Sequence, residues 1–273
     1  GVQTCALPIY FEVELAIVIG RRMRNVTPAA AARYIFGFTT AQDISDRTIH
    51  EASEAGCIEP NAFVLSYQWD YFVSASYYLQ QVEGVRTDVV VVDKELLRRS
   101  WYYAQLERQY PWLIANSRAE VNAFLVELRK FEHDLPYNPQ VIEARFAAVI
   151  RSFLERSAAD RPVYVTPEVE PQYTIGLSRV PSGLAERIMT QAPPTPLSDP
   201  RFTFQVPARR DSYVEGVVGL YAQAYARAAS YEASAGRTEH ALALVAKALE
   251  ISPNLPGALQ FQEQLKNQVN RGG

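Results

Sequence analysis

Apolar and polar residues alternate along residues 10–20, which predicts a β-strand with two different faces. Thr27 is placed to cap a short helix over residues 28–34, because the proline at position 28 suits the first turn of a helix. A second apolar run, residues 35–40, predicts another strand. Residues 10–48 are therefore predicted to form a β-α-β fragment.

The pattern changes to that of an α/β domain from residue 58 onward. Residues 63–67 predict a short strand, and the continuous β-branched run 89–92 predicts a strand that is buried on both faces. Helices are predicted at 71–82, with Asp70 as the cap, and at 94–109. Strands that alternate with helices at this spacing favour crossover connections and a small parallel sheet.

Two longer helices follow, each with one apolar stripe. Ser117 and Glu120 form a capping-box pattern at the start of the first helix, and Asn138, followed by proline, is placed to cap the second. Residues 161–165 and 173–180 predict further extended segments. The stripes consist of Val121, Phe124, Leu125, Leu128 and Phe131 in the first helix, and of Ile142, Phe146, Val149, Ile150 and Phe153 in the second.

The C-terminal part begins with a proline-rich segment, residues 191–210, which predicts an extended linker. Helices are predicted at 222–235, at 239–251 and from residue 256. Their small residues and proline, at positions 236, 241, 248 and 253, make residues 211–270 resemble one tetratricopeptide repeat. The predicted fold is thus a small parallel-sheet α/β domain, residues 58–190, followed by a helical tetratricopeptide-like hairpin and preceded by the β-α-β fragment. A generic helical hairpin would show the same pattern.

Composition and net charge argue against several classes of binding partner. The net charge of −3 gives no electrostatic basis for binding nucleic acid or an anionic membrane. No run approaches the roughly 18 consecutive apolar residues that span a bilayer. Both cysteines precede residue 58, which excludes a disulfide scaffold and a thiolate metal site in the rest of the chain.

Candidate chemistry lies in the first strand. Glu12 and Glu14 are two residues apart and therefore share one face of the strand, and Asp43 follows the next strand. Carboxylates this close repel one another unless a cation or a proton lies between them. Oxygen ligands without histidine or cysteine favour magnesium, manganese or calcium. The alternative is an ordinary solvent-facing strand with alternating glutamates.

Segments 11–22, 24–26, 34–39 and 43–47 resemble the fumarylacetoacetate hydrolase family. Members of that family cleave carbon–carbon bonds in diketo acids, or decarboxylate oxaloacetate-like substrates, with a bound divalent cation. The resemblance implies that Glu12, Glu14 and Asp43 are metal ligands and that magnesium or manganese is the cofactor. The chain departs from the family at Gln42, where the family often has asparagine.

This resemblance ends after about residue 48. The family's catalytic lysine, in a Gly-Lys motif, has no counterpart in the rest of the chain, and neither has the lid that carries a His/Glu pair. No catalytic residue is assigned, and the fragment is expected to be inactive. A complete metal-dependent hydrolase with an unusual C-terminal domain is the alternative.

A second group of polar residues follows the predicted strands of the α/β domain, where open α/β sheets bind ligands. The simpler interpretation is two helix caps, at Asp70 and Asp93, and a solvated basic turn, and we expect it to hold. Tyrosines and tryptophans in the same region are interpreted as packing residues rather than as a platform for sugars. The group comprises Asp70, Asp93, Lys94, Glu95, Arg98 and Arg99.

Segments 59–62, 67–71, 83–89, 93–102 and 162–167 resemble the C-terminal soluble part of a bacterial multi-pass membrane family of unknown function. That family is related to protein O-mannosyltransferases. The resemblance covers about residues 58–190. It implies a parent protein embedded in the membrane and a domain on the extracytoplasmic side, whereas the hydrolase-like part implies the cytoplasm.

Residues 1–9 resemble a translated sequencing-adapter oligonucleotide and are therefore not expected to be part of the fold. Residues 49–57 are interpreted as an artificial junction. The chain is therefore predicted to be a chimera without a complete activity of its own. The remaining alternative is a protein-interaction module that binds a partner through its C-terminal helices.

Overall fold

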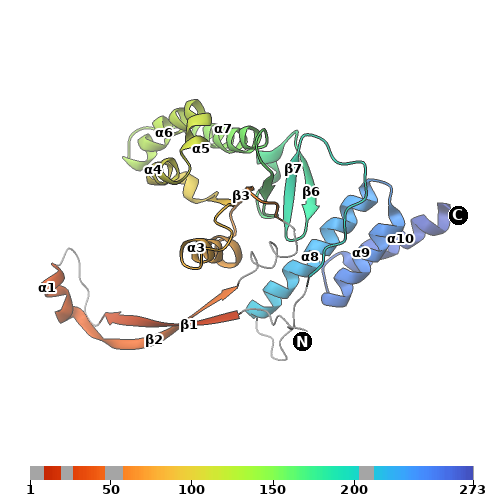
Figure 1. Cartoon of the computed structure of the whole chain (residues 1–273), viewed down its shortest axis with the longest axis horizontal. Helices are drawn as coiled ribbons and strands as arrows, with labels where there is room; N and C mark the ends of the chain where they lie inside the picture. Colours follow the sequence, from red (N-terminus) through yellow and green to blue (C-terminus); the bar gives the residue numbers. More distant parts are fainter. Residues whose placement is uncertain (1–8, 20–26, 47–57, 203–211, 273) are drawn as a thin grey trace.

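The computed structural model describes residues 9–19, 27–46, 58–202 and 212–272, and in the first two strands this description is of the backbone. These strands, β1 (Ile9–Ile19) and β2 (Ile35–Asp46), form an antiparallel ribbon that pairs with no other described strand. The short helix α1 (Pro28–Ala31) and a 3-10 turn, η1 (Ala32–Tyr34), lie at its far end (Figure 1). The two predicted strands are confirmed, although the second continues to Asp46.

A five-stranded sheet with the order β4-β3-β5-β7-β6 forms the centre of the α/β domain. Strands β4 (Val90–Asp93), β3 (Phe63–Ser66) and β5 (Val163–Val165) are parallel, as the pattern predicts. The sheet is mixed, however, because β6 (Ser178–Ser182) and β7 (Ala185–Met189) add an antiparallel hairpin.

Helices cover both faces of this sheet, so the domain has three layers (Figure 1). Successive strand residues point to opposite faces, and Val64 and Phe63 accordingly belong to different clusters of buried side chains. One face packs against four helices and the other against the π-helical turn η2 (Trp69–Val73) and the helix α3 (Ser74–Gln81). The four helices are α4 (Ser100–Gln109), α5 (Pro111–Asn116), α6 (Arg118–Glu132) and α7 (Pro139–Ser157).

The predicted cap of α7 is present, whereas the capping box predicted for α6 is not. Asn138 caps α7, its side-chain oxygen accepting from the backbone N–H of Gln140 at 2.9 Å. Ser117 precedes α6 but makes no capping hydrogen bond, because its buried hydroxyl accepts from Ser152 at 2.8 Å. Glu120 is bound to Arg156 instead of closing a capping box.

Two further predictions about helix starts are wrong. Asp70 lies inside the π-helical turn, whereas the residue before α3 is Val73. The predicted helix 94–109 is divided into a 3-10 turn, η3 (Leu96–Arg98), and α4, because Arg99 between them adopts an extended conformation.

The C-terminal part is helical, with α8 (Ser212–Ser234), α9 (Thr238–Ile251) and α10 (Ala258–Gly272). Helix α8 begins at Ser212, close to the start of the predicted helical region 211–270, and covers most of the helix predicted at 222–235. Gly236 joins α8 to α9 with φ of +78°, a conformation that glycine adopts without strain. Ala241 and Ala248 are buried between the helices, which lets their backbones approach closely. No helix among the described residues combines the length and apolar character needed to cross a membrane.

Candidate functional site

The backbone register of the ribbon brings the predicted metal-ligating residues together. Glu12 is directly opposite Asp43, and Glu14 lies two residues further along β1, opposite Ala41. Directly opposed residues of an antiparallel pair share a face, as do residues i and i+2 of one strand. Glu12, Glu14 and Asp43 are thus at neighbouring positions on one face, and their side chains lie outside the described part of the structure.

These three residues are carboxylates, the oxygen donors that magnesium and manganese prefer. Their oxygen donors and their shared face therefore suit a hard divalent cation. Among the side chains that the structure does describe, no group of three histidine, cysteine, aspartate or glutamate residues could hold a metal ion. The candidate metal ligands predicted from the sequence thus all lie on the ribbon.

The second group of candidates lies at the carboxyl edge of the parallel strands, where β3 ends at Ser66 and β4 at Asp93. Ser66 shares a buried hydrogen bond of 3.1 Å with Thr166, the residue after β5. The carboxylate of Asp93 accepts from the backbone N–H of Leu96 at 2.8 Å, at the start of η3. It does not cap the predicted helix 94–109, because that helix is divided and α4 begins only at Ser100. The side chain of Asp70 is outside the described residues.

Lys94 contradicts the prediction of a solvated basic turn, because its side chain is only 1% exposed. Its ammonium group lies 3.0 Å from Glu170 and 2.5 Å from Glu95, beneath the rings of Tyr67 and Tyr173. Burial lowers the pKa of Lys94, but the hydrogen bonds that its ammonium group donates to the two carboxylates outweigh this effect, and the net pKa is raised. Lys94 is therefore a fixed cation at neutral pH rather than a base or a nucleophile.

Arg98 is also ordered rather than solvated. It donates to both carboxylate oxygens of Glu143 in α7, and its guanidinium lies 4.0 Å from the centre of the Phe146 ring. These hydrogen bonds from Arg98 lower the pKa of Glu143. Arg98 thereby joins η3 to α7. Arg99 is exposed, as the prediction of a solvated turn requires.

The charges at this edge are mostly paired. Lys94 is a fixed cation, and the carboxylate of Asp93, whose pKa is raised by burial, accepts a backbone hydrogen bond. The side chains that complete the cluster, Glu143, Glu170 and Tyr173, are not among the residues that the sequence singles out. No local signal could have found them, because Glu170 pairs with a lysine 76 positions away.

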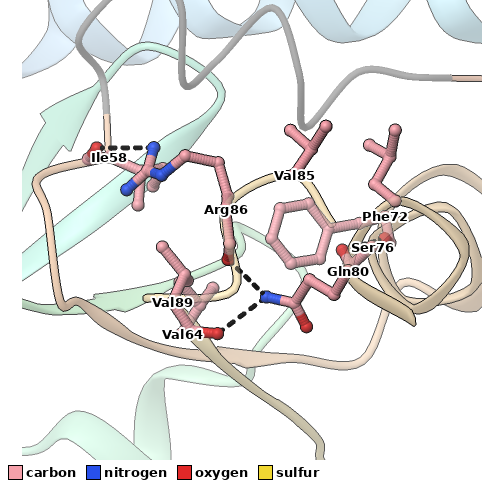
Figure 2. A pocket seen from close by; sticks show the side chains of 9 residues that line it. Ile58, Val64, Phe72, Ser76, Gln80, Val85, Arg86 and Val89 are labelled. Atoms are coloured by element: carbon pink, nitrogen blue, oxygen red, sulfur yellow. Dashed lines mark hydrogen bonds between the residues drawn. The ribbon is translucent and has the colours of Figure 1, made fainter. Parts of the chain in front are cut away.

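Two hollows of different size adjoin these elements. Figure 2 shows a pocket of about 20 Å³ between α3 and the sheet, where the Gln80 amide donates to the carbonyls of Arg86 and Val89. A pocket of that size holds one water molecule and no substrate. A larger cleft of about 480 Å³ lies beside η3 between α6 and α7, and its volume is typical of small-molecule sites.

The segment before α8 is held on the C-terminal helices by a separate polar cluster. Asp199 binds His240 at 2.7 Å and Lys247 at 2.6 Å, while the buried Glu232 accepts from the backbone N–H of Leu197 at 2.8 Å. The hydrogen bond to Asp199 raises the pKa of His240. The predicted linker is therefore packed against the helices over residues 197–202.

Comparison with known proteins supports the first resemblance. The family model described as "Fumarylacetoacetate (FAA) hydrolase C-terminal" matches residues 2–91, about a third of the chain. The matched range contains the whole ribbon and continues through β3 and α3 into β4, beyond the point near residue 48 where the motif resemblance ends. No curated protein and no solved structure gives a significant match to the chain.

Proposed function

We propose that residues 9–46 are a fragment of a fumarylacetoacetate hydrolase that keeps the family's cation-binding carboxylates and lacks the groups for turnover. The observation that carries this proposal is the register that sets Glu12 opposite Asp43. A bound magnesium or manganese ion would polarise the carbonyl oxygen of a keto acid. The chain's own contribution is to hold Glu12, Glu14 and Asp43 on one face, where a dication relieves their mutual repulsion.

Weak binding follows from the isolation of the ribbon. A site that is fixed on all sides holds its ligands at the required spacing before the metal arrives, and loosely held oxygen sites bind in the millimolar range. The ribbon pairs only with itself among the described strands. The family's catalytic lysine has no counterpart in this sequence, so we expect no turnover, because general acid–base catalysis is typically worth about 10² to 10⁴ in rate.

Calorimetric titration of the whole chain with manganese tests this proposal. We expect a dissociation constant near millimolar, loss of the signal in Asp43→Asn and Glu12→Gln, and an unchanged signal in Asp160→Asn, which removes an exposed carboxylate of the α/β domain. Turnover of acylpyruvate or oxaloacetate with magnesium should be absent. Micromolar binding together with turnover that Glu12→Gln abolishes would show instead a complete hydrolase.

The remainder of the chain, in this proposal, is the soluble tail of a membrane protein related to protein O-mannosyltransferases, joined artificially near residues 49–57, although the hydrolase family match runs across this junction to residue 91. Its α/β domain has two clusters of buried side chains, one of which includes Ile58, and its helical part has a third. The ribbon approaches this domain at the π-helical turn. The proposed boundaries remain 58–190, 191–210 and 211–270.

Limited proteolysis tests the division of the chain. Two-stranded ribbons are marginally stable in water, so we expect the N-terminal segment to be removed first and a resistant fragment to begin near residue 58. Mass spectrometry of the time course identifies the cleavage sites. A resistant fragment that begins near residue 10 would mean that the ribbon and the α/β domain fold as one unit.

Binding of a protein partner by the tetratricopeptide-like helices is the second candidate. It is favoured by Leu259 on α10, which is 59% exposed, and by the partly exposed Val269 on the same helix. A single repeat leaves apolar surface that neighbouring repeats or a partner would cover. Association of the chain with itself that Leu259→Ser abolishes would favour this candidate.

A further inference from the structure

The cleft between α6 and α7, defined here as the α6–α7 cleft, has an apolar wall and a polar end. Its volume is about 480 Å³. The polar end is formed by Glu95, Arg98, Arg99 and Glu143. The wall consists of Leu96, Phe124, Leu128, Phe131, Tyr137, Pro139 and Ile142. A hollow with a mainly apolar lining and a few converging polar groups is the usual form of a small-molecule site.

The wall continues the apolar stripe of α6 beyond the core. Phe124 and Leu128 are buried, whereas Phe131, predicted to be part of the same buried stripe, is 46% exposed. Its ring meets that of Tyr137, itself 45% exposed, edge to face at 5.2 Å. Two aromatic rings fixed against each other at the mouth of a cleft leave apolar surface in water, and covering that surface is favourable.

At the polar end of the cleft, the side chains of Glu95, Arg98 and Glu143 are paired, and that of Arg99 is not. Arg98 satisfies both oxygens of Glu143, and Glu95 is bound by Lys94 at 2.5 Å. Arg99, which also lines the cleft, is exposed, and its side chain makes no hydrogen bond or ion pair with the described residues. The cleft therefore presents a single unpaired guanidinium beside an apolar wall.

We propose that the α6–α7 cleft binds a small molecule with an aromatic or branched apolar body and one carboxylate. The body lies against Phe131 and Tyr137, and the carboxylate accepts two hydrogen bonds from the Arg99 guanidinium, whose planar fork matches it. Glu95 and Glu143 lie close by and disfavour anions of higher charge. This site is separate from the ribbon and does not depend on the function proposed for it.

Calorimetric titration of the whole chain with 4-phenylbutyrate tests the inference, with 4-phenylbutanamide as the uncharged analogue. We expect the carboxylate to bind at least about 10-fold more tightly than the amide, the ratio that corresponds to one charge-assisted hydrogen bond. Arg99→Gln should remove this preference, and Arg99→Lys should keep part of it. Tyr137→Ala should weaken the binding of both compounds.

Arg145→Gln is the matched control, because Arg145 is an exposed arginine of α7 that does not line the cleft. It should bind as the unchanged chain does. Arg99 is exposed, so its substitution leaves the core intact, and a thermal melt verifies the fold of each variant. Equal binding of acid and amide, a preference that survives in Arg99→Gln, or no binding of either compound up to about 10 mM would overturn the proposal.

Discussion

Alanine in place of Phe146 is expected to lower the free energy of unfolding by about 3–5 kcal/mol, the usual cost of emptying a fully buried phenylalanine site. The Phe146 side chain is 0% exposed. Its ring packs between those of Phe124 at 5.5 Å and Tyr173 at 5.8 Å, and it supports the guanidinium of Arg98. A loss of this size removes a large share of the roughly 5–15 kcal/mol that stabilises a typical domain.

Urea denaturation followed by circular dichroism measures this loss, and Phe131→Ala is its control. Phe131 is the same type of residue on the neighbouring helix α6 but is 46% exposed at the mouth of the α6–α7 cleft. Its removal should cost less than about 1 kcal/mol, because little apolar area leaves the interior. Equal losses in the two variants would show that Phe146 is not in the core of the domain.

The helices α6 and α7 could be predicted from the sequence because their apolar residues recur with the helical period. All five predicted stripe residues of α7, from Ile142 to Phe153, are buried. The parallel strands β3 and β4 were predictable for a related reason, since their apolar runs are bounded by turn residues and their positions are buried on both faces. Such signals are local and depend on no distant residue.

The hairpin of β6 and β7 was missed because its strands carry no strong alternation. Their positions are mostly half-buried, and β6 contains a proline at position 181. The local signal for the hairpin is Gly183, which forms the two-residue turn with Leu184 and has φ of +60° there. The prediction therefore treated residues 173–180 as one extended piece.

At the carboxyl edge of the sheet, the sequence alone predicts where the polar residues lie but not which of them are buried. Positions 93–99 could be identified from their place after a buried strand, but not the state of Lys94. A lysine that follows a strand is normally solvated. Its burial depends on Glu170 and on the rings of Tyr67 and Tyr173, which the fold brings from two other segments. The register of Glu12 and Asp43 is likewise set by the pairing of two strands.

Replacing Lys94 with alanine is expected to cost about 2–4 kcal/mol of unfolding free energy. The loss has two sources: the buried aliphatic stem, at about 0.8 kcal/mol per methylene group, and the ion pairs with Glu170 and Glu95. Breaking a fully buried pair costs about 3–5 kcal/mol. The two carboxylates here are 40% and 47% exposed, so water compensates for part of that amount.

Lys94→Met separates these two sources, because methionine keeps most of the stem and removes the charge. It should cost less than Lys94→Ala, and Glu170→Gln in the same chain should recover part of the loss, giving a coupling of about 0.5–3 kcal/mol in a double-mutant cycle.

Lys130→Met is the control. Lys130 is 39% exposed and pairs with Glu127 on the surface of α6, so its removal should change stability by no more than about 0.5 kcal/mol. If Lys94→Met costs no more than Lys130→Met and shows no coupling to Glu170, Lys94 contributes through its stem alone, and the carboxyl edge of the sheet is not organised around its charge.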